Sequence, residues 1–318
     1  MTMTPILIAG PTASGKSNLA LELALRLNGA VINTDSMQVY EDLRIISARP
    51  SQVEELKVPH FLYGVMDGAE RSSAGEWGRM AEEALEEAQA DGLRPIFVGG
   101  TGLYFTALTE GLSPIPEIPP QIRASAAKTI DKGGIATLYA DLEERDPETA
   151  AKVRPSDPQR IQRAWEVLEA TGRGLTDWQR EKTAPVLKEP AIKIVLEPLR
   201  QKLYARCERR FERMLGEGGL HEVSALLKRG LDPTLPVMKA LGIPEMGAYL
   251  HGDGSYDQAI KRAKLMTRRY AKRQMTWMRN QMGDWPRLDP SSPTLVDEAM
   301  ALIEAGPVSP SAIDASPS

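Results

Sequence analysis

Apolar runs and helical spacing alternate along residues 5–108 of the chain. Three short apolar runs are predicted as buried strands, at residues 5–10, 30–35 and 94–100. Three further segments carry apolar residues at helical spacing, at residues 17–27, 74–91 and 101–108. Strands and helices that alternate in this way predict an α/β fold, with a parallel sheet and helices on its faces.

The alternation stops at a proline-rich segment, residues 113–120, which holds four prolines and is predicted as a linker. The stretch that follows, 121–185, is rich in helix formers and charge and shows no clear strand. Residues 193–198 predict a return to the sheet, and helices then follow to about residue 283. We therefore expect a discontinuous core, an all-helical insertion and a disordered tail, at residues 1–119 with 191–290, 120–190 and 307–318, respectively.

Composition is that of a soluble globular protein, with 42% hydrophobic and 26% charged residues among 318. The net charge of −4 excludes a chain that is basic throughout, so any surface for nucleic acid must be local. A single cysteine excludes an internal disulfide and a cysteine zinc cluster, and the three histidines lack metal-ligand spacing. We find no signal peptide and no apolar run of about 20 residues, which predicts a cytoplasmic protein without a membrane span.

The loop between the first strand and the first helix reads GPTASGKS, the spacing of a phosphate-binding P-loop. In such a loop, backbone N–H groups and the positive end of the next helix surround phosphate oxygens. A lysine adds charge, and the hydroxyl of Ser17 can ligate Mg²⁺. The motif by itself leaves kinases, NTP-driven motors and diphosphate-using transferases open, and leaves ATP binding open with them. The residues predicted to hold phosphate are Gly10, Pro11, Thr12, Ala13, Ser14, Gly15, Lys16 and Ser17.

Asp35 ends the second predicted strand, at the edge of a doubly wound sheet where ligands bind. A carboxylate beside the P-loop can act as a general base. Ser36 and Gln38 add hydrogen-bonding groups, and the amide of Gln38, which both donates and accepts, suits the edge of a purine. The alternative is that Asp35 only caps a turn.

The third predicted strand runs into VGGTG, residues 98–102, where motor ATPases carry a magnesium-binding acid. The glycines allow the backbone to approach a ligand closely, and Thr101 offers a hydroxyl at the start of a helix. We interpret Thr101 as a phosphate or substrate contact, with a plain helix cap as the alternative.

A basic segment, residues 261–279, holds eight lysines and arginines and no acidic residue. Tyr270 and Trp277 are interleaved with these charges, which indicates a surface for a nucleic-acid backbone or a diphosphate. A solvated helix face is the alternative. A weaker group of arginines lies in the predicted insertion, at Arg160, Arg163 and Arg173.

Six motifs occur in one order along residues 5–285, and together they closely resemble the bacterial tRNA dimethylallyltransferase (tRNA isopentenyltransferase) family. They are GPTASGKS, DSMQVY, PH at 59–60, VGGTGLY, DPQRIQRAWEVLEATG and MTRRYAKRQMTWMR. The resemblance implies transfer of a dimethylallyl group from dimethylallyl diphosphate to N6 of the adenosine just 3′ of the anticodon, in tRNAs that read codons beginning with U. It implies Mg²⁺ as cofactor, the tRNA anticodon stem-loop and dimethylallyl diphosphate as partners, and no obligate protein partner.

The resemblance also carries expectations for single residues. Asp35 matches the family's general base, and Thr101 matches a threonine near the reacting groups. The P-loop would hold the diphosphate of the isoprenoid rather than an NTP. The residues that match tRNA contacts are Asp35, Ser36, Met37, Gln38, Thr101, Arg123, Gln159, Arg160, Ile161, Gln162 and Arg163, and Lys272 and Arg273 of the basic segment would help to hold the RNA backbone.

Three short segments depart from the family pattern. ISARP at 46–50 stands where GTAKP is common, so Arg49 replaces a lysine, and arginine keeps the charge but not the geometry. GIPE at 242–245 stands where GYKE is common, and PHF at 59–61 lacks a second histidine. These departures leave local substrate contacts open, but not the reaction.

Three other functions stay open. An isopentenyltransferase that acts on free AMP, ADP or ATP would share the P-loop and Asp35, but a mononucleotide requires neither the insertion nor the basic segment. A nucleoside or metabolite kinase would use Lys16 to hold ATP and Asp35 to activate a hydroxyl. A non-catalytic, nucleotide-dependent RNA-binding module would need an acidic magnesium ligand of the switch type, which we do not find. The diphosphate compound that binds productively distinguishes these functions.

Overall fold

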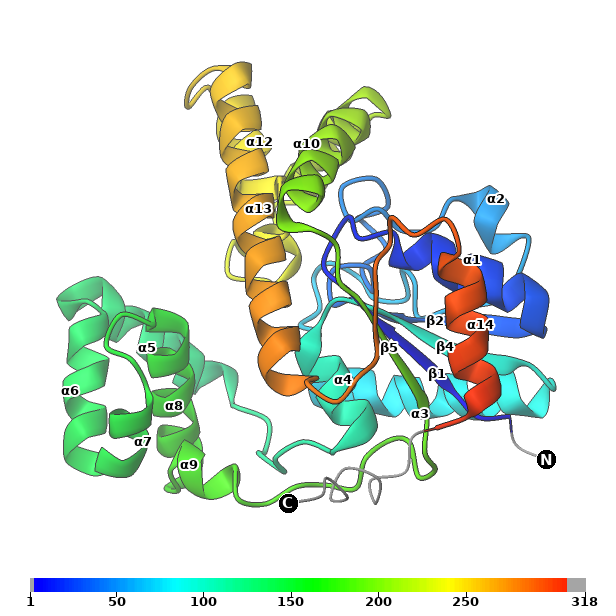
Figure 1. Ribbon diagram of the computed structural model, residues 1–318. Helices are drawn as coiled ribbons and strands as arrows, with labels where there is room; N and C mark the ends of the chain where they lie inside the picture. Colours follow the sequence, from blue (N-terminus) through cyan, green and yellow to red (C-terminus); the bar gives the residue numbers. More distant parts are fainter. Residues whose placement is uncertain (1–2, 308–318) are drawn as a thin grey trace. The chain divides into compact units, whose positions relative to one another are not determined.

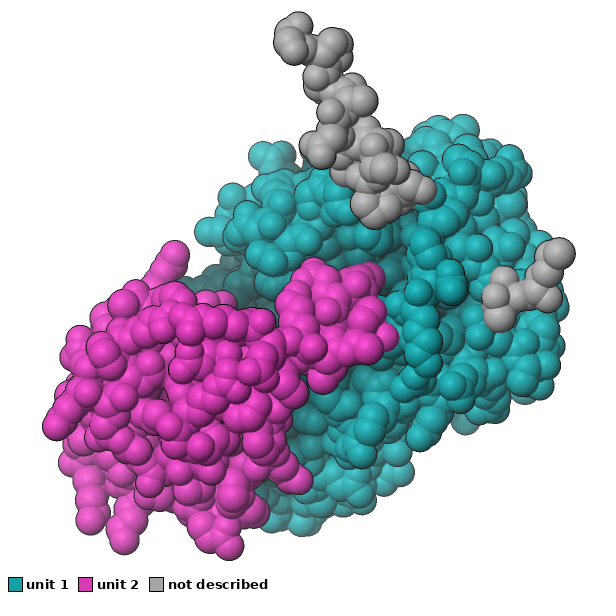
Figure 2. Space-filling model, turned by 90° about the horizontal axis from the view of Figure 1, so that it is seen from below, with its two compact units in different colours: residues 1–108, 186–318 teal, residues 109–185 magenta. Residues whose placement is uncertain are grey.

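The computed structural model describes residues 3–307, which form two compact units (Figure 2). Unit 1 takes the described residues of 1–108 and 186–318, and unit 2 comprises 109–185. The proline-rich segment therefore belongs to the helical unit, whereas we expected it to end the core. Leu112 and Thr183 explain this, because the two exchange hydrogen bonds that hold the chain segments at the start and end of unit 2 side by side. The predicted disordered tail lies outside the described residues from 308 onward.

Unit 1 is built on a six-stranded parallel sheet in the order β3-β2-β4-β1-β5-β6 (Figure 1). The strands are β1 Ile6–Ala9, β2 Gly29–Thr34, β3 His60–Phe61, β4 Arg94–Gly99, β5 Ile192–Leu196 and β6 Arg287–Leu288. The predicted α/β fold is confirmed, together with the four longer strands. The two-residue strands β3 and β6 are too short to show a hydrophobic pattern. Because β4 lies between β1 and β2, the segments that follow these three strands meet at one edge.

Apolar residues of alternate strand positions face helices on the two sides of the sheet. On one side, Ile8 of β1 packs in a core cluster with Leu23 of α1 (Lys16–Leu27). Helix α14 (Leu295–Ala305) adds Ala299 and Ile303 to the same cluster. Leu7, absent from that cluster, is equally buried. Helix α14 extends the core beyond residue 290, where we had expected it to end, because its apolar side chains cover β5 and β6.

The remaining helices of unit 1 are α2 Gln52–Glu55, α3 Ala74–Ala90, α4 Gly102–Thr109, α10 Arg200–Gly216, α11 Gly219–Lys228, the 3₁₀ turn Val237–Lys239, α12 Ile243–Leu250 and α13 Tyr256–Gln281. They include α10, α12 and α13, which project away from the sheet (Figure 1). Helices α10 and α13 pack against each other, and the basic segment lies on α13. No helix within residues 3–307 is long and apolar enough to cross a membrane.

Unit 2 is a bundle of five helices over its described residues: α5 Pro120–Gly133, α6 Ile135–Arg145, α7 Pro147–Lys152, α8 Pro158–Thr171 and α9 Leu175–Trp178. Its separate core contains Leu138, Leu142 and Trp165. Asp146 and Asp157 each cap a helix whose first residue is proline. Proline suits this position because the N–H that it lacks would have no partner within the helix.

Replacement of Trp77 by alanine tests the packing of α3 on the sheet. The buried indole stacks on Tyr104 with 4.0 Å between ring centroids, and its Nε1 donates to the carbonyl of Asn33 at 3.1 Å. We expect Trp77→Ala to lower the free energy of unfolding by about 3–5 kcal/mol, because it leaves a cavity and an unpaired carbonyl. Urea titration measures the change, with the exposed Leu56→Ala as control. A loss no larger than that of the control would contradict this packing.

Candidate active site

The P-loop turns tightly between β1 and α1. Its shape requires left-handed backbone at Ala13 and Gly15, with φ of +62° and +96°. Gly10 N–H donates to the carbonyl of Gly99, and Ser14 N–H donates to the carbonyl of Pro11. These bonds close the loop, and the N–H of Thr12 is also bonded, to Oε1 of Gln274. The N–H groups of the first turn of α1 are available to an anion.

Lys16 is buried at the start of α1. Its Nζ donates to the carbonyl of Pro11 at 3.3 Å. Burial lowers the pKa of Lys16 from 10.5 to about 8, and the negative charge of Asp35 works in the opposite direction. Arg210 of α10 lies close enough to both for its charge to act on Lys16 and to feel Asp35. The structure thus gathers two cations and one carboxylate around the P-loop.

The residues at the P-loop fit a diphosphate. The hydroxyl of Ser14 is buried and has no hydrogen-bond partner among the described residues. This is expected for a group that donates a hydrogen bond to a bound ligand. A Cβ on Gly10 would lie 2.7 Å from that hydroxyl, so glycine keeps the space open. Ser17 is exposed in the first turn of α1 and offers the kind of oxygen that Mg²⁺ accepts.

Asp35 follows β2 directly, and its backbone is held by the buried side chain of Asn33. Asn33 Oδ1 accepts the N–H of Asp35 at 2.8 Å, while its Nδ2 donates to the carbonyls of Asp35 and Leu62. One carboxylate oxygen of Asp35 accepts the N–H of Met37 at 3.0 Å. The turn is therefore fixed, and the other oxygen makes no hydrogen bond within residues 3–307.

Thr101 joins Asp35 at the same edge of the sheet. Thr101 N–H donates to the carbonyl of Thr34, and its Oγ1 accepts the N–H of Ser36 at 2.9 Å. Tyr270 of α13 lies close enough to Thr101 and Asp35 for both to act on its phenol. Burial raises the pKa of Tyr270, and the negative charge of Asp35 adds to that effect. Thr101 is thus bonded to the segment at the end of β2, and its side chain does not cap α4.

Gln38 differs from our expectation. Its Nε2 donates to the carbonyls of Ser47 and Ala48, both at 2.9 Å. Since both amide hydrogens are used there, the side chain cannot both donate to and accept from a purine. Its Oε1, which accepts no hydrogen bond within residues 3–307, is the group left for a ligand.

In unit 2, two of the predicted tRNA contacts lie close together, and a third, Ile161, is buried. Arg123 of α5 and Arg163 of α8 are close enough for the charge of Arg123, after burial, to lower the pKa of Arg163. Ile161 is fully buried in the core of unit 2, so its side chain packs inside the unit and does not face a ligand. Arg160 pairs with Asp157 at the exposed start of α8. Of the other two residues of this segment, Gln159 is exposed, and Gln162 donates to Glu166.

The basic segment on α13 has fewer free charges than its sequence suggests. Lys264, Arg268 and Arg279 form ion pairs with acids of α10 and of the chain after β5. Lys272 and Arg273, in contrast, have no ion pair within residues 3–307. Gln274, the next residue, is buried and contacts the P-loop.

The IPP transferase family model matches residues 38–281, and the isopentenyl transferase model matches residues 3–64. The chain belongs to the IPP transferase family. A tRNA dimethylallyltransferase of Rhodopseudomonas palustris (strain BisB18) is 52% identical over 286 residues, which cover 90% of each protein. Another, of Methylocella silvestris, is 52% identical over 300 residues, which cover 94% of this chain and 98% of that protein.

Solved structures give the same result. The tRNA isopentenylpyrophosphate transferase of Bacillus halodurans matches with a TM-score of 0.66 and 32% identity over 95% of both chains. A eukaryotic dimethylallyltransferase acting on tRNA matches with a TM-score of 0.76 and 29% identity, over 95% of this chain and 77% of the other. The resemblance that the six motifs indicated is therefore confirmed.

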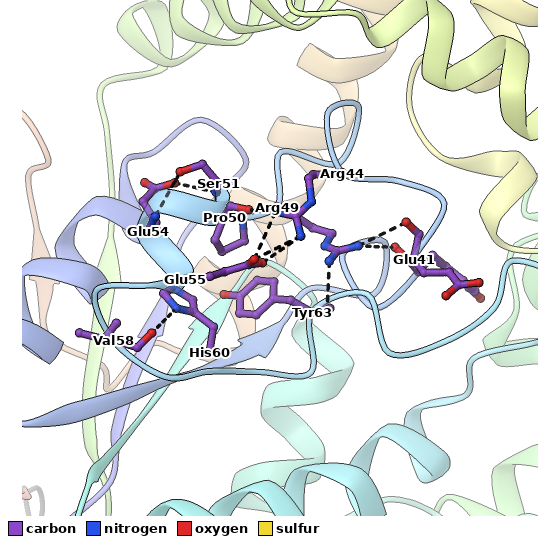
Figure 3. A network of polar contacts seen from close by, with 11 residues as sticks. Glu41, Arg44, Arg49, Pro50, Ser51, Glu54, Glu55, Val58, His60 and Tyr63 are labelled. Carbon is purple, nitrogen blue, oxygen red and sulfur yellow. Dashed lines mark hydrogen bonds and ion pairs between the residues drawn. The ribbon is translucent and has the colours of Figure 1, made fainter.

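Arg49 of the ISARP segment donates to three backbone carbonyls (Figure 3). Its guanidinium donates to Tyr40, Glu41 and Tyr63, and burial lowers its pKa. A Cβ at Gly64 would overlap the guanidinium, which explains a glycine with a φ of +62° there. Arg49 therefore braces the loop that follows Asp35.

Sequence reasoning missed two residues of this site. Arg210 lies in a helix with six arginines and lysines, where nothing in the spacing marks one of them. Gln274 is the polar member of an otherwise apolar buried face of α13, which was a readable signal. We gave that segment only a role in binding nucleic acid because its positive charges dominated the pattern.

Lys16→Met tests the cost of burying the lysine. The folded-state pKa of about 8 is below the unfolded value of 10.5, so the unfolded chain binds more protons between these values. Stability of the ligand-free protein should therefore rise with pH through this window, and burial of the charge should cost most below it. At pH 7 we expect the variant to be more stable by up to about 3 kcal/mol, a difference that closes as the pH rises.

Urea unfolding at several pH values measures this difference, with the exposed Lys57→Met as the matched control. A variant that is less stable than the wild type at pH 7 would show that the bond from Lys16 to Pro11 outweighs the cost of burial.

Proposed function

We propose that this protein transfers the dimethylallyl group of dimethylallyl diphosphate to N6 of the adenosine just 3′ of the anticodon, in tRNAs that read codons beginning with U. The products are the N6-dimethylallyl adenosine and pyrophosphate. The observation that carries the proposal is the position of Asp35 beside Lys16 and the P-loop, in a member of the IPP transferase family. A base and an anion site that share one edge of the sheet fit the attack of an amine on a diphosphate ester.

Each residue has a part in one displacement. The N6 lone pair forms a bond to C1 of the dimethylallyl group, and the C–O bond breaks with its electron pair on the diphosphate. Asp35 takes the N6 proton, since its unbonded oxygen has room for a donor. Loop N–H groups, Lys16 and Arg210 stabilise the charge that gathers on the leaving group. Thr101, which is hydrogen-bonded to Ser36, keeps the acceptor side of the site in place.

Mg²⁺ would be held by Ser17 and by the diphosphate itself, and it would supply further positive charge to the leaving group. Among residues 3–307, the three carboxylates that lie close enough for a metal ion are Glu41, Asp42 and Asp67, but Arg229 already pairs with both aspartates. We therefore do not assign Mg²⁺ to these three carboxylates.

The tRNA would meet both units. On unit 1, Lys272 and Arg273 offer unpaired charges for the RNA backbone, and Asp35 to Gln38 border the place for a base. On unit 2, Arg123, Gln159, Arg160, Gln162 and Arg163 offer polar groups for the anticodon loop. The adenosine must leave its stack to reach Asp35, as a base in single-stranded RNA can do at low cost. Because tRNA is the substrate, the proposal includes a cytoplasmic location.

Transfer to a free nucleotide is the second candidate. It would use the same P-loop and Asp35, but would give no role to unit 2 or to the unpaired charges on α13. The tRNA reaction accounts for both.

The test is incubation of the purified protein with Mg²⁺, dimethylallyl diphosphate and an unmodified anticodon stem-loop, with AMP in a parallel reaction. Nucleoside mass spectrometry reads the products. We expect one dimethylallyl unit on the target adenosine and none on AMP. Transfer to AMP alone would assign the protein to the free-nucleotide class, and transfer to neither would overturn the proposal.

Asp35→Ala tests the general base. We expect turnover to fall by roughly 10²–10⁴, because the N6 proton then has no acceptor. Affinity for the stem-loop should change little, since this residue is one of many contacts. Single-turnover assays and filter binding measure the two quantities. Near-normal turnover would remove Asp35 from the chemistry.

The double variant Lys272→Ala, Arg273→Ala tests the RNA surface of α13. Each phosphate contact that is lost should reduce the slope of log affinity against log salt by about 0.7–0.9, so we expect weaker binding with a flatter slope. The control is Lys57→Ala, an exposed lysine outside this surface. If the double variant keeps the wild-type slope, α13 contacts something other than the RNA backbone.

A further inference from the structure

Gln274 is a buried polar residue on the inner face of a highly basic helix. Its side chain is 5% exposed, and the neighbouring buried residues of α13 are apolar, among them Ala271, Met275 and Met278. A buried amide is costly unless its groups are hydrogen-bonded, so such a residue needs an explanation.

Both ends of the Gln274 amide bind backbone groups of the candidate active site. Its Oε1 accepts the N–H of Thr12 in the P-loop at 2.8 Å, and its Nε2 donates to the carbonyl of Gly100 after β4 at 2.9 Å. Since an N–H can only donate and a carbonyl can only accept, these partners fix the orientation of the amide. The residue bridges Thr12 and Gly100, which are 88 residues apart in the chain, and joins them to α13.

The glycines after β4 fit this contact. A Cβ on Gly100 would lie 2.2 Å from Nε2 of Gln274, and one on Gly102 would lie 2.5 Å from the indole of Trp277. We had interpreted these glycines as space for a ligand. They are required at least as much by the close approach of α13.

Gln274 and Lys16 act on the same peptide group of the P-loop. Lys16 Nζ donates to the carbonyl of Pro11, and Gln274 Oε1 accepts the N–H of Thr12, the other end of that peptide. A diphosphate would draw the ammonium group of Lys16 toward its own oxygens. The bond from Gln274 does not involve the cation, so it holds the peptide in either case.

We propose that Gln274 is a positioning residue, whose amide locks the Pro11–Thr12 peptide of the P-loop to Gly100 and so shapes the loop for the diphosphate. This inference rests on the proposed function for the identity of the substrate. In this proposal, the buried face of α13 with Gln274 supports the diphosphate site, and the exposed residues Lys272 and Arg273 carry the charges proposed for RNA.

The first test is Gln274→Met, which keeps the length of the side chain and removes both hydrogen bonds. Two unpaired backbone groups should weaken pyrophosphate binding, measured by calorimetry with Mg²⁺, by roughly 10–100-fold. KM for dimethylallyl diphosphate should rise with it, whereas affinity for the stem-loop and its salt slope should match the wild type. The control is Gln281→Met, the same change at the exposed end of α13.

The second test is Gln274→Glu, whose side chain has the wild-type donor and acceptor only when it is protonated. Its pyrophosphate affinity relative to that of the wild type should therefore rise as the pH falls. A merely structural role would reduce stem-loop and pyrophosphate binding together. This variant also serves if Gln274→Met does not fold.

Any of three results would overturn the inference. Gln274→Met could bind pyrophosphate as tightly as the wild type, or lose affinity for pyrophosphate and for the stem-loop equally. The pyrophosphate affinity of Gln274→Glu relative to the wild type could also be independent of pH. The wild-type protein is assayed for transfer in parallel. Absence of transfer there would refute the proposed function, while the pyrophosphate measurements would still decide the role of Gln274.

Discussion

The site depends on how closely the backbone segments at the ends of β1, β2 and β4 approach one another. Gly10 N–H bonds to Gly99, and Thr101 N–H bonds to Thr34, so main-chain hydrogen bonds tie the three strand ends together. A Cβ on Gly99 would lie 1.9 Å from the carbonyl of Thr34. The absence of a side chain at this one position therefore lets the P-loop, Asp35 and Thr101 share one edge of the sheet.

This close approach creates an electrostatic problem that a substrate can solve. Lys16 is buried and Arg210 is partly buried, with Asp35 as the carboxylate that acts on both. One carboxylate does not offset the desolvation of two cations, and the pKa of each is lowered. A diphosphate would supply the missing negative charge. The ligand-free protein thus carries a strained charge arrangement, which is the usual cost of a site preorganised for an anion.

In the proposed function, helix α13 serves two ligands. Tyr270, Gln274 and Trp277 follow one another at helical spacing. Tyr270 lies near Thr101, Gln274 donates to the carbonyl of Gly100, and Trp277 lies against Gly102. Lys272 and Arg273 are exposed, and the guanidinium of Arg273 lies over the ring of Tyr270, 5.7 Å from its centroid. Because the inner face is bonded to the catalytic loops, RNA held on α13 would be held at a fixed place relative to the diphosphate.

Much of the fold and of the site was predictable from local pattern. The strands of four or more residues, the P-loop spacing and the position of Asp35 after a strand follow from hydrophobic runs and turn chemistry, which are properties of neighbouring residues. Helix α14 and the short strands β3 and β6 were not predictable in the same way. Their place depends on an exposed sheet edge or face that exists only after the rest of the chain has folded.

The sequence by itself thus determined the reaction class, through six motifs in one order, and the residue types that phosphate and a proton require. Only the tertiary structure decided which of many similar side chains take part. It places Arg210, one of several arginines of α10, near Asp35, and it buries Ile161 in the core of unit 2. It also bonds Nε2 of Gln38 to two carbonyls and Oε1 of Gln274 to the P-loop. The physical reason is that burial and hydrogen-bond partners arise from segments far apart in the chain, which no local pattern records.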